Sequence, residues 1–535
     1  MKEEFLWWRD GVIYQIYPRS FYDSDGSGIG DLKGITEKLD YLADLGIDAI
    51  WLSPINPSPD KDFGYDVSDY LSIDPKFGSM VDFESLLRET GKRGIRVIMD
   101  LVLNHSSNQH PWFLESRSSR DNPKRDWYIW RDGKKSGRPP NNWLAVMGGR
   151  AWEWDELTEQ YYLHHYYKEQ PDFNWRHPEV RKRLLDVFRF WLDKGVKGFR
   201  LDVFHLFFKD SQLRDNPVRP FQLRPDQRRA FIYNCDRPEM LGLLSEIRNL
   251  LDEFDESYAI GETLLSNPEK SAKYCGNDRL HQAFLFDFLK CSWETCDFEN
   301  TICYWEKALG PNNWPNYVLN NHDVKRSASR FGHGEDDERL KVAAAMLLTL
   351  RGTPFLYYGE EIGMREVSLK RSQILDPVGL RFWPFYKGRD GCRTPMQWDG
   401  TKNAGFTAGH PWLPLHPDWR QRNVKFQVGD KKSLLNFYKA LIALRRTEPV
   451  LVKGDFRIIK NMPKDVMGYQ RKHKNREARV YLNFGKKEHQ IPICLDNRIP
   501  LKIFSNKREK PSSFSEGMIN LRGNEALILV SENLV

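Results

Sequence analysis

An arginine and an aspartate lie two residues apart in the segment GFRLDVFHLFF, residues 198–208. The rest of this segment has the composition of a buried strand, where ions without partners are unfavourable. In a strand, residues two apart point to the same face, so Arg200 and Asp202 share one face with Gly198. The two charges should therefore either neutralise each other or take part in chemistry.

Ionisable side chains also close other apolar segments of the chain. They occur in DFGYD, DLVLNH, IGET and LNNHD: Tyr65, Asp66, Asp100, His105, Glu262, His322 and Asp323. A single acid at a strand end is most often a structural hydrogen-bonding group, but five such ends meeting at one place indicate a site. Like charges in one cavity raise one another's pKa. Enzymes that cleave glycosides use one ionised carboxylate and one protonated carboxylic acid, and Arg200 could keep one of these carboxyl groups ionised.

Eight short apolar segments provide the strands that would position these side chains. They are residues 12–18, 48–54, 96–104, 198–204, 258–263, 282–288, 316–321 and 353–360. Amphipathic segments lie between them, and several end in Lys or Arg followed by Gly, a common helix stop signal. The alternation predicts an α/β fold, a (β/α)₈ TIM barrel, in which the carboxyl ends of the strands bear the chemistry.

The spacing of these strands predicts two further units. Residues 105–175, between the third and fourth strands, are too long for one helix and are rich in Trp, Tyr, His and Gly, so we expect an inserted small domain there. Later segments alternate with period two, which predicts a C-terminal antiparallel β-domain over residues 453–535. The barrel is then expected to consist of residues 1–104 and 176–452.

Composition and charge exclude several classes of protein. The 535 residues suffice for a barrel of roughly 250 residues with satellites. The net charge of +7 is not gathered on one segment, so we expect no nucleic-acid partner. No signal-peptide pattern and no membrane span of roughly 18 apolar residues occurs. The seven cysteines show no short repeated spacing, which argues against a disulfide framework or a zinc ribbon and favours the cytoplasm.

The motifs DLVLNH, GFRLD, GET, NNHD and GRDGCRTPMQW, in this order, resemble glycoside hydrolase family 13, the α-amylase superfamily. The likeness is strongest to its α-glucosidase and oligo-1,6-glucosidase branch and extends over essentially the whole chain. It implies the same barrel and no organic cofactor. It also implies a retaining, exo-acting α-glucosidase that releases α-glucose from the non-reducing end of short α-glucosides through a covalent glucosyl-enzyme intermediate.

The resemblance implies a role for each of three acids. Asp202 resembles the nucleophile, and Glu262 resembles the general acid that later acts as the base. Asp323 is similar to the acid that grips the 2- and 3-hydroxyls of the sugar. Arg200 would set the ionisation of the nucleophile, and Asp100 would orient Arg200. For the retaining route, the nucleophile and acid carboxyl groups should lie about 5–5.5 Å apart.

Other residues resemble those that bind the terminal glucose. His105 and His322 are similar to histidines that hydrogen-bond its hydroxyls, and Tyr65 to an aromatic residue that stacks on its face. Asp62, in KDFGYD, and Arg393, in GCRTPMQW, match a pair that closes the non-reducing end. A closed pocket admits one terminal glucose, so short oligosaccharides or disaccharides are the expected substrates.

The linkage preference depends on Val203, which follows the expected nucleophile. In this branch, valine accompanies a preference for α-1,6 bonds, and threonine or alanine a preference for α-1,4 bonds. Such a difference is worth only ~1–3 kcal/mol, and the next residues, FHLFFKDSQLRDNP, depart from the usual oligo-1,6-glucosidase sequence. An α-1,4-preferring maltase and an α-glucosyl transferase therefore stay open as alternatives. A non-catalytic relative, like a transporter ectodomain, is a remote one, because this chain retains all three acids.

A metal site is predicted near the start of the chain, in YDSDGSGIGDL. Its candidate ligands are Asp23, Asp25, Ser27, the carbonyl of Ile29, and Asp31. Alternating oxygen ligands in a glycine-rich loop suit a hard cation such as Ca²⁺. The segment resembles the family's calcium loop, usually DSNGDGIGD, with Ser27 where aspartate is common. The lost charge should weaken binding, so structural Ca²⁺, Mg²⁺ and an empty turn all stay open.

Overall fold

Eight parallel strands form the central sheet of the protein. The computed structural model describes residues 4–219, 229–263, 267–332, 337–493, 500–508 and 517–532. The strands of this sheet are β1 (Ile13–Ile16), β2 (Ala49–Leu52), β3 (Arg96–Leu101), β7 (Gly198–Leu201), β8 (Tyr258–Gly261), β9 (Gln282–Ala283), β10 (Asn316–Val318) and β11 (Thr353–Tyr357). Their order in space is β10, β11, β1, β2, β3, β7, β8 and β9, and all eight lie inside the predicted segments. The predicted (β/α)₈ barrel is confirmed.

Side-chain amides connect the two end strands of the sheet, β9 and β10. The amide nitrogen of Asn316 donates to the carbonyl of Ala283 at 2.7 Å, and its amide oxygen accepts from the backbone of Leu285 at 3.4 Å. The amide of Gln282 reaches the hydroxyl of Thr353 on β11 at 3.0 Å. These buried amides satisfy backbone groups that a strand ladder would otherwise pair.

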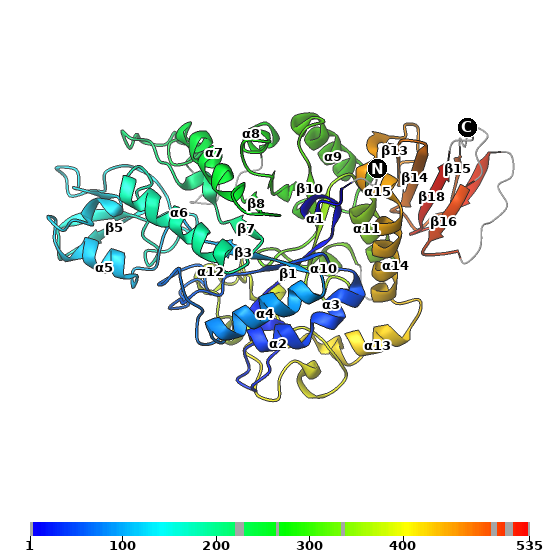
Figure 1. The fold of residues 1–535 in the computed structure, drawn as a ribbon, viewed down its shortest axis with the longest axis horizontal. Helices are drawn as coiled ribbons and strands as arrows, with labels where there is room; N and C mark the ends of the chain where they lie inside the picture. The colour runs from blue at the N-terminus through cyan, green and yellow to red at the C-terminus, as the bar shows by residue number, and fades with distance from the viewer. Residues whose placement is uncertain are drawn as a thin grey trace.

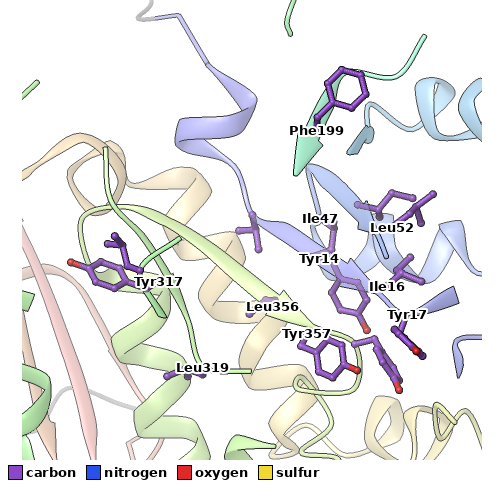
Figure 2. Close-up of a cluster of buried hydrophobic side chains, with 14 of the residues drawn as sticks. Tyr14, Ile16, Tyr17, Ile47, Leu52, Phe199, Tyr317, Leu319, Leu356 and Tyr357 are labelled. Atoms are coloured by element: carbon purple, nitrogen blue, oxygen red, sulfur yellow. The ribbon is translucent and has the colours of Figure 1, made fainter. Parts of the chain in front are cut away.

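Alternate residues of the strands pack into two separate cores. The core inside the barrel contains Ile13, Ala49, Trp51, Ile98, Tyr258, Ile260, Phe284, Val318 and Phe355. Residues between them in the sequence, such as Tyr14, Leu52 and Phe199, belong to the larger core under the helices, part of which Figure 2 shows. Arg200 follows Phe199 and so faces the barrel interior, as the strand period requires. Its guanidinium lies 5.5 Å from the centre of the Trp51 ring.

Helices surround this sheet (Figure 1). In chain order they are α1 (Trp7–Asp10), α2 (Leu32–Glu37), α3 (Leu39–Leu45), α4 (Met80–Lys92), α6 (Pro178–Asp193), α7 (Glu239–Leu251), α8 (Pro268–Lys273), α9 (Thr295–Leu309), α10 (Ser327–Phe331), α11 (Glu338–Thr349), α12 (Pro377–Phe382), α13 (Val424–Gly429), α14 (Leu434–Thr447) and α15 (Pro449–Lys453). Local sequence sets their ends. A capping box of Ser79 and Asp82 starts α4, and Gly46 ends α3 at a φ of 91°.

Two smaller β-units flank the barrel at opposite ends of the molecule (Figure 1). The first lies between β3 and α6 and has α5 (Pro111–Ser118) and the antiparallel strands β4 (Trp130–Arg131), β5 (Trp152–Asp155) and β6 (Gln160–Leu163). The second comprises β12 (Asp455–Ile458), β13 (Val466–His473), β14 (Arg476–Asn483), β15 (His489–Pro492), β16 (Pro500–Ser505), β17 (Met518–Leu521) and β18 (Ala526–Glu532). Its larger sheet runs β12-β13-β14-β18-β16, and β15 pairs with β17.

The described helices and cysteines bear on two expectations from the sequence, namely that the chain has no membrane span and no disulfide framework. Among the described residues, no helix is both long enough and apolar enough to cross a lipid bilayer. The described cysteines are Cys235, Cys275, Cys291, Cys296, Cys303 and Cys392, and all are free thiols. The described part of the chain is thus held together by packing and hydrogen bonds rather than by disulfides.

Candidate active site

One guanidinium joins the two acids predicted to do the chemistry. Asp202 directly follows β7, and Glu262 directly follows β8. Arg200 Nη1 donates to Asp202 Oδ1 at 2.6 Å, and its Nη2 donates to Glu262 Oε2. Two carboxyl groups that are 60 residues apart in the sequence therefore face each other at the carboxyl ends of neighbouring strands, where barrel enzymes have their active sites.

Arg200 is itself fixed by the end of β3. The same Nη1 donates to Asp100 Oδ1 at 2.7 Å, and the hydroxyl of Tyr65 donates to Asp100 Oδ2 at 3.1 Å. Arg200 is only 1% exposed, so its position is set by protein contacts rather than by solvent. The family resemblance implied that Asp100 orients Arg200, and the two side chains form an ion pair.

Burial dominates the electrostatics of this cluster. It raises the pKa of Asp202 and of Glu262, while Arg200 acts in the opposite direction on both. It also raises the pKa of Asp100 to about 6 against the charge of Arg200. One buried cation therefore faces three carboxyl groups, and burial favours the protonated form of each while Arg200 favours the anion.

Asp323 stays an anion for a different reason. Burial opposes its ionisation, but the charge that His322 carries when it is protonated, and the permanent charges of Arg389 and Arg393, hold its pKa well below the usual range. Arg393 Nη2 donates to Asp323 Oδ1 at 2.9 Å, and Arg389 Nη1 approaches the same oxygen at 3.4 Å. Its side chain keeps a third of its surface exposed, so the anion is accessible from outside the protein.

Asp62 and Arg393, the two residues predicted to close the non-reducing end, have no hydrogen bond to each other among the contacts of the described residues. Asp62 Oδ1 accepts instead from Arg389 Nη2 at 2.8 Å, whereas Arg393 Nε donates to the carbonyl of His322 at 2.8 Å. Both arginines lie in GRDGCRTPMQW, and a 3₁₀ turn over Asp390–Cys392 separates them and directs them to different partners. Asp376 fixes Arg389 from the other side, because its carboxylate accepts from Arg389 Nε at 2.9 Å.

A glutamine of the inserted unit completes this end of the site, and the sequence analysis did not identify it. The amide nitrogen of Gln170 donates to Asp62 Oδ2 at 3.2 Å and to the carbonyl of Tyr65 at 3.0 Å. Its side chain is fully buried. The only sequence signal was its place in QPDFNW, where an uncharged polar residue gives no charge pattern to notice.

The two predicted histidines flank Tyr65 as neutral imidazoles. The Tyr65 ring stacks on His322 with centroids 5.4 Å apart, and its hydroxyl lies 2.7 Å from His322 Nε2. His105 Nε2 lies 3.0 Å from the carbonyl of Tyr65. Burial lowers the pKa of His105 to about 4 and that of His322 to about 3. Both rings are therefore uncharged hydrogen-bonding groups at neutral pH.

Val203 occupies a strained position beside Asp202 and Glu262. Its φ of 36° and ψ of 37° are left-handed, which is unfavourable for a β-branched residue. Its backbone N–H lies 3.4 Å from Glu262 Oε2, and its side chain packs with Tyr166, Leu206 and Cys235. The Val203 side chain, directly after Asp202 in the sequence, therefore contacts Tyr166 of the inserted unit.

Comparison with known proteins identifies the family. The model of the alpha amylase catalytic domain matches residues 15–454. The chain belongs to the α-amylase family. The resemblance inferred from the motifs, to glycoside hydrolase family 13 and its α-glucosidase branch, is confirmed, and the protein is a glycoside hydrolase.

Relatives of this α-amylase family member match it over nearly its whole length. A probable alpha-glucosidase of Rhizobium meliloti is 44% identical over 497 residues, which cover 90% of this chain and 89% of the relative. An oligo-1,6-glucosidase of Parageobacillus thermoglucosidasius is 42% identical over 521 residues, covering 90% and 91%. The crystal structure of the alpha-glucosyl transfer enzyme XgtA superposes with a TM-score of 0.93 at 39% identity and covers 99% of this chain and 100% of that chain.

The acidic loop near the start of this α-amylase family chain is compact. Carboxylate oxygens of Asp23, Asp25 and Asp31 lie within 4.8 Å of one another. The Ser27 hydroxyl donates to the carbonyl of Ile29 at 3.1 Å. Asp31 also caps α2 and Asp23 accepts backbone N–H groups, so both carboxylates have structural roles without an ion. The oxygen-only donor set fits a hard divalent cation.

Proposed function

We propose that this glycoside hydrolase is a retaining, exo-acting α-glucosidase that removes α-glucose from the non-reducing end of short α-glucosides. The observation that carries the proposal is the Arg200 guanidinium, which contacts both Asp202 and Glu262. An anionic nucleophile and a protonated acid on one cation are what a double displacement needs.

In the first displacement, Asp202 attacks the anomeric carbon of the terminal glucose. The bond from that carbon to the leaving oxygen breaks, and Glu262 gives its proton to this oxygen. Arg200 bonds both carboxyl groups, and the proposed step requires the anion on Asp202 and the proton on Glu262 at this stage. The product of the step is a glucosyl ester of Asp202 and a free leaving group.

In the second displacement, water attacks the same carbon while Glu262 takes one of its protons. The bond from the carbon to Asp202 breaks, and the two side chains return to their starting states. Two inversions at one carbon give net retention, so the released glucose is the α-anomer. An acceptor hydroxyl in place of water gives a new glucoside by the same step.

The closed end of the site supports exo-action. Asp62, Arg389 and Gln170 form a buried, hydrogen-bonded group there. Asp323 and the neutral His322 lie beside it, where the hydroxyls of a single glucose ring would reach them. A wall of this kind blocks an extended polysaccharide and accepts one terminal unit.

The linkage preference proposed is α-1,6, because Val203 borders the catalytic pair and the Parageobacillus relative is an oligo-1,6-glucosidase. The test is hydrolysis of maltose, isomaltose, sucrose, trehalose and kojibiose, with products followed by anomer-resolved NMR. We expect kcat/KM for isomaltose to exceed that for maltose by at least about tenfold, and α-glucose to appear first. Val203→Thr should shift the ratio toward maltose, whereas Val218→Thr, at a side chain that is 61% exposed, should not.

Two results would contradict these proposals separately. Strong turnover of maltose with negligible turnover of isomaltose would establish an α-1,4-preferring maltase, and Val203 would then not determine the linkage. β-Glucose as the first product would exclude the double displacement itself. An α-glucosyl transferase is the second candidate, supported by the similarity to XgtA, and the same spectra would reveal it as new glucosides that outweigh free glucose.

We propose that the acidic loop of Asp23, Asp25 and Asp31 holds a structural Ca²⁺. Saturating Ca²⁺ after chelator treatment should raise the unfolding temperature, since ligand at about 100 Kd stabilises a fold by roughly 2.7 kcal/mol. Asp25→Asn should abolish this shift, and Asp121→Asn, in an exposed loop of the inserted unit, should retain it. An equal response to Mg²⁺ would reassign the ion, and no response to either would leave the loop as a turn.

We also propose that the enzyme works in the cytoplasm. The free thiols of the described cysteines support a reducing compartment, where disulfides are rare. Fractionation of cells that express the protein at its native level checks the location. Enrichment outside the cytoplasm would contradict it.

A further inference from the structure

The loop that bears His322 and Asp323 is closed by a single side chain. Asn320 lies at its start, after β10, and Ser327 at its end, where α10 begins. The amide oxygen of Asn320 accepts from the backbone N–H of Ser327, and the amide nitrogen donates to the Ser327 hydroxyl at 2.8 Å. Asn320 is 3% exposed. One buried amide therefore links the two ends of the loop, and Arg393 Nε holds the carbonyl of His322 within it.

A carboxyl group outside the catalytic cluster helps to set the orientation of this amide. Asn320 donates its remaining amide N–H to Glu360 Oε2, and the hydroxyl of Tyr438, on α14, donates to Glu360 Oε1 at 3.0 Å. Glu360 follows β11 and is 5% exposed. If the amide rotated by half a turn, its oxygen would face the carboxyl oxygen of Glu360 and its nitrogen would face the N–H of Ser327. Both contacts would be repulsive while Glu360 is ionised, so Glu360 and the Ser327 N–H together favour the observed orientation.

We propose that Glu360 is a positioning residue that holds Asp323 in place through Asn320. The inference rests on the proposed function in one respect, namely that Asp323 contacts the reacting sugar. Glu360 itself touches neither that sugar nor the catalytic pair. It acts by supplying a hydrogen-bond acceptor at a fixed point behind the loop.

The surroundings of Glu360 indicate that the acceptor matters and the charge does not. Titratable groups that face it are Glu361 beside it, Tyr438 on α14 and Arg330 on α10. Arg330 gives its guanidinium to the carbonyls of Leu289 and Leu319 rather than to Glu360. Burial, opposed by the bonds from Asn320 and Tyr438, raises the pKa of Glu360 to about 7. Glu360 is thus partly neutral at neutral pH, and either form can accept from Asn320.

Substitutions that separate acceptor, charge and bulk test the inference. Glu360→Leu keeps the bulk but removes the acceptor, and we expect kcat on an α-glucoside to fall about 30-fold with KM changed less than about threefold. Glu360→Gln keeps an acceptor oxygen and should stay within about threefold of the wild type in both constants. The matched control is Glu361→Leu. Glu361 is also buried, but it accepts from Tyr14 and Tyr41, which lie outside this loop, so kcat should change less than about threefold.

A reversal of the hydrogen bond gives a test that does not depend on the leucine variant being folded. At a pH where Glu360 is ionised, Asn320→Asp places an acceptor against the acceptor of Glu360 and should lower kcat by about 30-fold. Combining Asn320→Asp with Glu360→Gln restores a donor–acceptor pair, now reversed in direction, and should return kcat to within about fivefold of the wild type. Unfolding temperatures and far-UV circular dichroism of all variants check that they are folded.

The outcomes distinguish this inference from the proposed function. An equal loss of kcat in Glu360→Leu and Glu361→Leu would overturn the positioning role in favour of general packing. A double variant no more active than Asn320→Asp alone would overturn it as well. Asp323→Asn, measured on the same substrate, tests the proposed role of Asp323, and a wild-type rate there would reject that role without involving Glu360.

Discussion

Replacing Asp202 with asparagine is expected to lower kcat on any α-glucoside by about 10⁴- to 10⁶-fold. The amide is uncharged and cannot form the glucosyl ester, while its size and its contact with Arg200 are nearly kept. Substrate should still bind, because the groups expected to contact the glucose hydroxyls are unchanged. Steady-state rates and calorimetric binding of isomaltose measure the two effects. Asp193→Asn, at the exposed end of α6, is the control and should have no effect.

A smaller substitution at the same position tests the direction of attack. Asp202→Ala should leave space beside the anomeric carbon on the side opposite to the leaving group. With an activated α-glucoside, added azide should then enter that space and give β-glucosyl azide, because a single displacement inverts the carbon. α-Glucosyl azide, or undiminished hydrolysis by Asp202→Asn, would show that Asp202 is not the nucleophile.

The sequence was sufficient to predict the barrel and the part of the site that its strands position. Alternation of period two fixes which side chains face inward, so Arg200 and Asp202 had to share the barrel interior. Parallel strands align their carboxyl ends, so Asp100, Asp202 and Glu262 had to meet at one edge of the sheet. These arguments need only the periodicity of the sequence and the general geometry of a closed parallel sheet.

The residues that close the glucose end could not be predicted in the same way. Arg389 and Arg393 lie in one motif four residues apart, and no periodicity determines which of them meets Asp62. Their directions depend on a 3₁₀ turn and on Asp376, a residue that packs there only in the folded protein. Gln170 reaches the site from the inserted unit, whose docking on the barrel depends on tertiary contacts rather than on local pattern.

Replacing Arg200 with lysine should give the second large effect, a loss of about 10²- to 10³-fold in kcat/KM with a shifted pH profile. A lysine ammonium cannot serve Asp100, Asp202 and Glu262 at once, as the guanidinium does. Burial already raises the pKa of Asp202, and weaker pairing raises it further. Because the nucleophile must be an anion, the acidic limb of the kcat/KM profile should move to higher pH.

The same change should alter stability with a defined sign. Breaking a buried ion pair by removing one partner is worth about 3–5 kcal/mol of unfolding free energy, and the lysine variant should lose part of that. Burial raises the pKa of Asp100 to about 6, above that of an unfolded chain, so its contribution to stability decreases as pH rises through that value. The unfolding temperature of Arg200→Lys should therefore fall more steeply than that of the wild type between pH 5 and about pH 7.

Arg389→Lys separates this effect from a general loss of positive charge at the site. Arg389 forms ion pairs with Asp62, Asp376 and Asp323, and among the described contacts it has none with Asp202 or Glu262. It should raise KM and leave the acidic limb of the profile in place, since the ionisation of Asp202 depends on Arg200. Equal displacement of that limb in both variants would mean that the net field of the pocket sets the nucleophile's pKa. The guanidinium of Arg200 would then be one of several charges that set the pKa of Asp202, rather than the group that keeps Asp202 ionised beside a protonated Glu262.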